Sequence, residues 1–402
     1  MDTAVRRASL AVFAVFVACG WGFASWAARM PAVRDGLSLR PDQMGVLLLV
    51  ASAGSLVALP MSGLVVQRIG VRRTIGVGAA GYAAAMTLVA VGVQLGSLWV
   101  VVPPLPLLGV FIGLWDAAMN MEGTVVEQRL GRTVMPRYHA GFALGSVVAA
   151  AVAAAAAGLH VPVVVHLPVA FGLALVAVLV ALRRFLPEDA SRFAAPADQP
   201  RRSVFAAWTE RRTLLVGLVV LGAALAEGSA NDWLSLAVVD GFSTSDAIGA
   251  VGFALFVAAM TGARFVSTGF IDRWGRVTVL RVSTVAALAG LALFVLAGPL
   301  WLALVGATVW GAGAAVGFPV GMSAAADDPG HAPARVAVVS TLGYTAFLAG
   351  PPLLGLLAHH VGYRAALSAV ALPVVVALVL SRTVAPPDSR GRIGGRPDEV
   401  LT

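Results

Sequence analysis

The sequence contains no lysine and a single cysteine, Cys19. Without lysine there is no phosphate-binding loop of the Gly-x-x-x-x-Gly-Lys type, so we expect no ATP-driven activity from this chain. One cysteine excludes an intramolecular disulfide and a cysteine-rich metal site. The sequence also shows no metal-ligand spacing and no hydrolase motif. We therefore expect neither an enzyme nor a bound cofactor.

Charged residues are scarce as well. They make up 12% of the 402 residues, against 59% hydrophobic residues and a mean hydropathy of +0.89. Soluble proteins carry about 25% charged residues, so the composition indicates a polytopic membrane protein. The arginines fall in short clusters between apolar runs, whereas a nucleic-acid site would gather them on one soluble face. We expect the lipid bilayer, and no nucleic acid, as a partner.

The apolar runs are long enough to cross a membrane, which takes about 20 mostly apolar residues. The first is longer than the core of a signal peptide, and similar runs follow it. The sequence predicts twelve spanning helices, at 8–28, 43–66, 74–95, 99–122, 138–158, 161–182, 212–231, 246–270, 277–297, 300–325, 334–358 and 363–384. The predicted fold class is all-α, with about twelve transmembrane helices.

The arginines also predict the orientation, because cytoplasmic loops are enriched in Lys and Arg. Of the 28 arginines, only Arg29, Arg34, Arg40 and Arg364 fall on the other side of the membrane; Arg264 is counted with an inside loop. Both termini are thus predicted to be cytoplasmic, in a multi-pass protein of the bacterial plasma membrane. A Pro- and Arg-rich linker, 184–211, separates bundles at 1–183 and 212–384, and the tail 385–402 is expected to be disordered.

The two halves repeat each other. The segment Arg68-x-Gly70 that follows the second helix aligns with Arg273-x-Gly275 after the eighth, 205 residues later. Duplicated six-helix halves are typical of transporters that hold the substrate near the membrane midplane.

These segments resemble the signature of the major facilitator superfamily, Gly-x-x-x-Asp-Arg-x-Gly-Arg-Arg, over a resemblance that covers about residues 8–384. The matching residues are Gly63, Arg68, Gly70, Arg72 and Arg73 in the first copy, and Asp272, Arg273, Gly275 and Arg276 in the second. The resemblance implies that they form a conformational latch of the outward-open state. Gln67 replaces the usual Asp of the first copy, which weakens the latch there, and Thr268 replaces the leading Gly of the second.

A narrower resemblance lies in residues 116–127 and 136–146, which are similar to a bacterial branch near the fucose permease-like symporters. Those proteins use a carboxylate on helix 4 for proton coupling, a role that Asp116 or Glu122 would take here. They also use an acid on helix 1, which this chain lacks. The Gly-Pro motif typical of drug–proton antiporters on helix 5 is absent too, and this disfavours drug export.

Polar residues on the fourth helix are the first candidate site. Asp116 and Asn120 are four residues apart and share a helix face, while Glu122 points about 120° away. Asp116 lies in the inner half if the helix starts at Trp99, and nearer the middle if it starts after Pro103-Pro104. Asp116 is either a proton or ligand site or a paired structural acid. Glu122 is either such a site or an interfacial acid.

The seventh helix supplies the second group. Glu227 and Asn231 share a face, and each is a candidate for proton coupling or substrate binding, whereas Asp232 is expected at the outer rim. Trp115 and Trp310 either stack on a sugar ring or cation or serve as packing residues.

Together these features predict a monomeric secondary active transporter that moves a small organic solute, coupled to protons, by alternating access of two halves. Two alternatives stay open: an efflux antiporter for drugs or metabolites, and a membrane sensor or scaffold without transport.

Overall fold

The computed structural model describes residues 3–131, 134–187, 207–328 and 331–386, and this part of the chain is helical, with no β-strand. The N-terminal half comprises α1 Thr3–Ala27, α2 Met30–Gly36, α3 Pro41–Ile69, α4 Val71–Gln94, α5 Leu98–Val101, α6 Leu105–Leu130, α7 Met135–Gly158 and α8 Val163–Leu182. The C-terminal half comprises α10 Arg211–Phe242, α11 Asp246–Leu296, α12 Leu300–Ala314, α13 Gly317–Ala325, α14 Ala332–Val361, α15 Tyr363–Ala366, η1 Leu367–Val370, α16 Ala371–Val379 and η2 Leu380–Val384.

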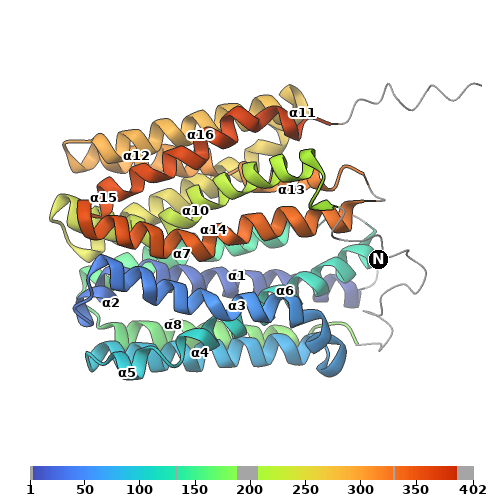
Figure 1. Cartoon of the computed structure of the whole chain (residues 1–402). Helices are drawn as coiled ribbons and strands as arrows, with labels where there is room; N and C mark the ends of the chain where they lie inside the picture. The colour runs from blue at the N-terminus through green and yellow to red at the C-terminus, as the bar shows by residue number, and fades with distance from the viewer. Residues whose placement is uncertain (1–2, 132–133, 188–206, 329–330, 387–402) are drawn as a thin grey trace, which may run out of the picture.

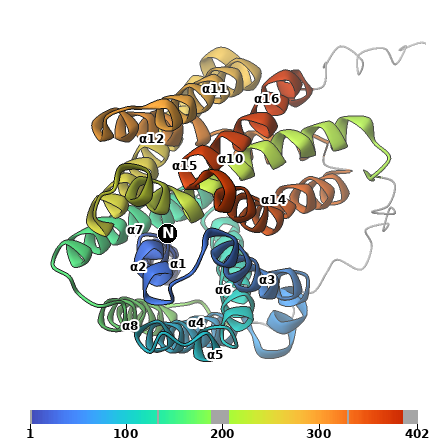
Figure 2. The same ribbon diagram turned by 60° about the vertical axis from the view of Figure 1, so that its left-hand side comes forward.

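The helices lie side by side and form two bundles, α1–α8 and α10–η2 (Figures 1 and 2). Eleven helical stretches are long and apolar enough to cross a membrane. One of them, α11, bends at Gly275 and contains two spans, so the predicted twelve-helix fold class is confirmed. We call the end where α1 begins and η2 finishes the terminus face, and the end with α2, α5 and α15 the far face (Figure 1).

The repeat predicted from the signature is visible in the backbone. Gly70 joins α3 to α4 with φ +82° and ψ 158°, and Gly275 bends α11 with φ +75° and ψ 154°. Side chains with a Cβ rarely adopt positive φ of this kind, which explains glycine at both positions. The two copies therefore make the same turn.

Two predicted helices differ from the structure more than the others in where they end. The helix expected at 99–122 is a short α5 followed by a turn at Val102–Pro104, and α6 then runs from Leu105 to Leu130. The helix expected at 212–231 continues to Phe242. Hydropathy continues through both of these places, so it could not mark the ends. Most of the predicted linker 184–211 and tail 385–402 lies outside the described residues.

The far face is closed between the halves. A Cβ built on Gly45 of α3 would lie 2.7 Å from the carbonyl oxygen of Pro351 of α14, and one on Gly355 would lie 2.7 Å from that of Pro41. Arg34 of α2 forms an ion pair of 2.6 Å with Asp240 of α10. The two glycines bring backbone against backbone, and the ion pair joins side chains of the two halves. Together these contacts seal this end.

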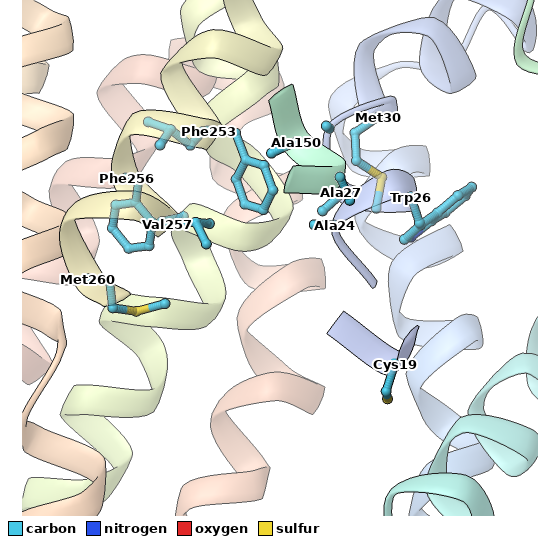
Figure 3. Close-up of a cluster of buried hydrophobic side chains, with 14 of the residues drawn as sticks. Cys19, Ala24, Trp26, Ala27, Met30, Ala150, Phe253, Phe256, Val257 and Met260 are labelled. Carbon is cyan, nitrogen blue, oxygen red and sulfur yellow. The ribbon is translucent and has the colours of Figure 1, made fainter. Parts of the chain in front are cut away.

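An apolar seal continues inward from the far face. In Figure 3, Phe253 of α11 points toward Ala150 of α7 and Ala27 of α1. All three belong to the buried core, and each is 2% exposed or less. The core thus crosses from one half to the other in this part of the molecule.

Toward the terminus face, a cavity of about 890 Å³ opens between α1, α6, α7 and α11. Its lining is mostly apolar and includes Arg6, Phe13, Arg137, Tyr138 and Phe265. The molecule is therefore sealed at the far face and hollow toward the terminus face.

Candidate functional site

The middle of α6 carries the first acid. Since α6 starts after Pro103-Pro104, Asp116 lies eleven residues from the start of the helix and fourteen from its end. Asn120 donates from Nδ2 to the Asp116 carbonyl oxygen at 2.9 Å and to its Oδ1 at 3.3 Å. The charge of Asp116 reaches Cys19 of α1 and Tyr344 of α14. Because α14 belongs to the other half, Asp116 lies within electrostatic reach of both halves.

Asp116 has no counter-ion in the part of the chain that the structure describes. Among the described residues, it forms no ion pair, and an amide is its one hydrogen-bonding neighbour. A charge in a membrane interior costs roughly 2.5–3.5 kcal/mol on insertion scales. Protonation removes that cost, so this carboxyl group is suited to taking up and releasing a proton.

The middle of α10 carries the second acid, in a different setting. Glu227 Oε2 accepts a hydrogen bond from Nη2 of Arg264 on α11 at 2.8 Å, and their side chains are 19% and 35% exposed. Nε of Arg264 donates to the carbonyl oxygen of Ala315 at 3.1 Å. This carbonyl is available because the tenth span breaks between α12 and α13, at Ala315 and Val316.

The prediction that Arg264 lies in an inside loop is wrong. The structure places it eleven residues before the bend at Gly275, or about 16 Å along the helix axis. The signal for it was present: an arginine inside a predicted apolar helix needs a polar partner. The partner itself, 37 residues away in sequence, could not be read from the pattern.

The neighbours of Glu227 are half-buried. Asn231 lies one turn further along α10, and Asp232 follows it. The expectation that Asp232 sits at the outer rim is wrong, because α10 continues ten residues past it. A binding role for Asn231 stays a prediction.

Glu122 lies further along α6 than Asp116. It is eight residues before the end of the helix and 1% exposed. The adjacent Gly123 lies against Tyr138 and Met135 of α7. The acid is therefore enclosed within the N-terminal half, and its proposed part in coupling stays untested.

The two tryptophans of the candidate set also pack inside single halves. Trp115 is 1% exposed and meets Tyr82 edge-on at 6.4 Å, and Trp310 is fully buried and meets Phe256 edge-on at 5.4 Å. This geometry agrees with packing. Stacking on a ligand stays a prediction.

The signature residues lie at the terminus face. Arg72 donates to the carbonyl oxygen of Phe185 at 3.0 Å, and Arg276 pairs with Asp327 at 2.6 Å. A Cβ on Gly63 would meet nothing within 4 Å. The remaining signature residues with side chains are exposed, namely Arg68, Arg73, Asp272 and Arg273. Their function as a latch stays a prediction.

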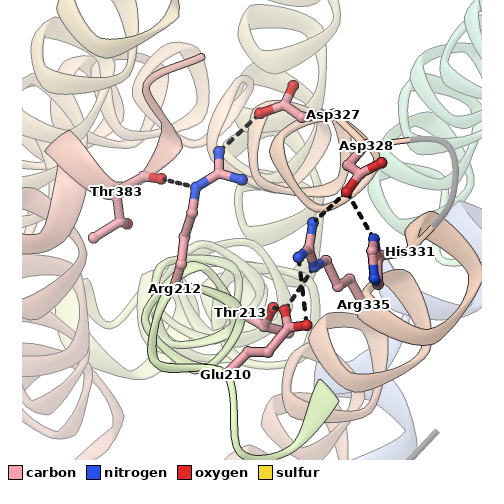
Figure 4. A network of polar contacts seen from close by, with 8 residues as sticks. All are labelled: Glu210, Arg212, Thr213, Asp327, Asp328, His331, Arg335 and Thr383. Atoms are coloured by element: carbon pink, nitrogen blue, oxygen red, sulfur yellow. Dashed lines mark hydrogen bonds and ion pairs between the residues drawn. The ribbon is translucent and has the colours of Figure 1, made fainter. Parts of the chain in front are cut away.

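Asp327 is part of a wider polar network, shown with its neighbours in Figure 4. It also accepts from Arg212 at 2.8 Å, and Arg335 pairs with Glu210 at 2.6 Å. Every residue drawn belongs to the C-terminal half. The network therefore ties α10, α14 and the end of η2 together at the terminus face.

Comparisons with known proteins agree with this architecture. The family model of the Major Facilitator Superfamily matches residues 10–299 and 253–400. The transporter y4wD of Sinorhizobium fredii is 32% identical over 381 residues, covering 90% of this chain and 97% of its own.

Two crystal structures share the fold. The nucleoside transporter NupG has a TM-score of 0.71 and 16% identity over 95% of this chain and 98% of its own. FucP in the outward conformation has a TM-score of 0.65 and 14% identity over 94% and 99%. With the family match, the duplicated glycine turns and the twelve spans, the chain belongs to the major facilitator superfamily.

Proposed function

We propose that this protein is a proton-coupled secondary transporter for a small polar organic solute, working by alternating access in a bacterial plasma membrane. The observation that carries the proposal is the position of Asp116, an acid that has no counter-ion among the described residues and lies within electrostatic reach of both halves, which are sealed together at one end. Relatives named as transporters support the class.

In this proposal the two midmembrane acids have different tasks. Asp116 takes and releases the proton, because it has no cation to hold it ionised. The pair of Glu227 and Arg264 presents one negative and one positive group from the other half, and so binds polar groups of the solute. Asn120 and Asn231 lie one turn from these acids and supply amide groups.

We further propose that both termini are cytoplasmic, that 184–211 links bundles at 1–183 and 212–384, and that the chain acts as a monomer. The four arginines that the sequence assigns to the non-cytoplasmic side support this orientation, because all of them lie at the far face. Arg29 and Arg34 lie beside and in α2, Arg40 precedes α3, and Arg364 lies in α15. The closed far face then corresponds to an inward-open state.

Proteoliposomes that contain a trapped pH dye test the coupling. Nucleosides and hexoses are added singly, and internal acidification reports proton movement with solute. We expect at least one of these solutes to cause internal acidification in liposomes that contain the wild type. Asp116→Asn should lose this signal yet retain exchange of labelled solute, and Asp116→Glu should retain part of it. Solute-driven proton movement of wild-type size in Asp116→Asn would refute the assignment.

Alternating access is tested separately at the far face. Gly45→Ala places a methyl group against the backbone of α14, whose atoms are the three nearest to the added Cβ, so the halves are expected to separate there. Spin labels at Leu95 and Leu296, which end spans in opposite halves, report the separation. We expect longer distances in Gly45→Ala and no change in Gly172→Ala, where the added Cβ meets nothing within 4 Å. Equal distances in both would contradict a rocking mechanism.

A further inference from the structure

A buried polar cluster lies between α1 and α8, towards the far face. The two helices are antiparallel and are tied at two levels. Trp21 donates from Nε1 to the carbonyl oxygen of Ala170 at 2.9 Å, and Arg29 donates from Nη2 to that of Val161 at 2.8 Å. These bonds fix which residues oppose each other between the two levels.

Ser25 and His166 fall in that space. Ser25 is one turn after Trp21, and His166 is one turn before Ala170, so in this register they lie opposite each other. The charge of Arg29 reaches His166 as well. Ser25 is fully buried, Arg29 is 4% exposed and His166 is 7% exposed. The cluster is thus enclosed on all sides by the protein.

Most polar atoms of this cluster have no partner. Within the described residues, Nε and Nη1 of Arg29, both ring nitrogens of His166 and Oγ of Ser25 make no hydrogen bond. Buried polar groups are almost always hydrogen-bonded, and leaving one unsatisfied costs about 1–3 kcal/mol. Five such atoms in one place indicate that something outside the chain satisfies them.

The charge of the cluster is uncompensated as well. Arg29 forms no ion pair in the described part of the chain; Asp246 of α11 acts on it only at longer range. Burial lowers the pKa of the Arg29 guanidinium, because the charged form loses its hydration, and Asp246 offsets this only in part. A water molecule would supply hydrogen bonds but would leave the positive charge unbalanced.

We propose that Arg29, His166 and Ser25 form a binding site for a small inorganic anion such as chloride. All three side chains can donate hydrogen bonds, and those from the guanidinium are charge-assisted. The site is distinct from the proposed transport site, because Arg29 is ten residues, or about 15 Å, beyond Cys19, the α1 residue that Asp116 acts on. The anion would hold the end of α1, and with it α2, against α8.

The test is the thermal stability of the purified protein in sodium chloride and in sodium gluconate at equal ionic strength. An anion that binds only the folded state stabilises it, so we expect saturating chloride to raise the melting temperature by about 2–4 °C. Arg29→Gln and His166→Phe should each abolish this difference. Arg34→Gln, which removes a far-face arginine with carboxylate partners, should retain it.

Crystals grown in sodium bromide give a second readout, with anomalous density expected between Arg29 and His166. A wild type with equal melting temperatures in the two salts would overturn the proposal and favour bound water. A chloride effect of wild-type size in Arg29→Gln would overturn it too. If Arg29→Gln fails to fold, His166→Phe and the bromide crystal decide the question.

Discussion

The acids in the middle of α6 and α10 have different polar neighbours in the two halves. In the N-terminal half, the one hydrogen bond to the Asp116 carboxyl group within the described residues comes from the amide of Asn120. In the C-terminal half, Glu227 is paired with Arg264, which also holds the broken backbone at Ala315. A carboxylate in contact with a cation stays ionised, whereas a carboxylate in the membrane without such a contact takes up a proton at little cost in free energy.

This difference separates two candidates that hydropathy and helical spacing treat alike. Both acids lie at the centre of a spanning helix, and both have an asparagine four residues later. Arg264 distinguishes them, because it pairs with Glu227, whereas Asp116 forms no ion pair among the described residues. A proton carrier is therefore better placed in the N-terminal half and a fixed charge pair in the C-terminal half, as the proposed mechanism requires.

The largest effect should come from giving Asp116 a cation of its own. Asn120→Lys places an ammonium group one turn away on the same face, which makes the N-terminal half resemble the C-terminal half. The carboxylate should then stay ionised, and solute-driven proton movement in proteoliposomes should fall to background. Asn120→Gln, which keeps the amide, should retain it.

Exchange of labelled solute, measured in the same variant, shows whether substrate binding is affected together with proton movement. If Asn120→Lys loses proton movement while labelled solute still exchanges, the proton step alone is affected. Undiminished proton movement in Asn120→Lys would mean that Asp116 is not the carrier, and the contrast between the halves would lose its functional meaning.

A smaller effect is expected on stability. Glu227→Gln leaves Arg264 without its counter-ion, and breaking a buried pair costs about 3–5 kcal/mol. Because the Arg264 side chain is 35% exposed, we expect roughly 1–3 kcal/mol, seen as a lower melting temperature. Asp116→Asn breaks no ion pair among the described residues and should lower the melting temperature less than Glu227→Gln does.

The double variant Glu227→Gln with Arg264→Gln provides the control, since removing both charges should recover much of the loss. Equal destabilisation by Asp116→Asn and Glu227→Gln would show that the two acids are held alike, against the difference in their contacts.

Much of the fold could be predicted from the sequence, because the apolar runs and the repeated Arg-x-Gly turn are local signals. The limits were local too: α6 begins only after Pro103-Pro104, since hydropathy continues through the turn at Val102–Pro104. The site was predicted less well. Asp116 and Glu227 stood out as polar residues in apolar helices, but the contacts of Arg264 bridge 37 and 51 residues. Such pairs depend on how helices pack, and one sequence does not record that.

The smallest effect concerns the terminus face, where the C-terminal half again pairs its acids. The Arg335 guanidinium, 2.6 Å from Glu210, holds the pKa of Glu210 below its usual range despite some desolvation, and a hydrogen bond from Thr213 adds to this. A carboxyl group with a lowered folded-state pKa stabilises the protein above its unfolded pKa of about 4.3. That contribution disappears as the pH falls through the folded-state value.

Glu210→Gln should therefore lower the melting temperature at pH 7 slightly, by the equivalent of about 1 kcal/mol or less. The melting temperatures of Glu210→Gln and the wild type should converge below about pH 4. Asp272→Asn, which removes an exposed acid that has no ion pair in the described part of the chain, should show no such convergence. A Glu210→Gln curve parallel to the wild type from pH 7 to pH 3 would mean that Arg335 contributes nothing to stability through this acid, and the contrast between the halves would then rest on other pairs, such as Glu227 with Arg264.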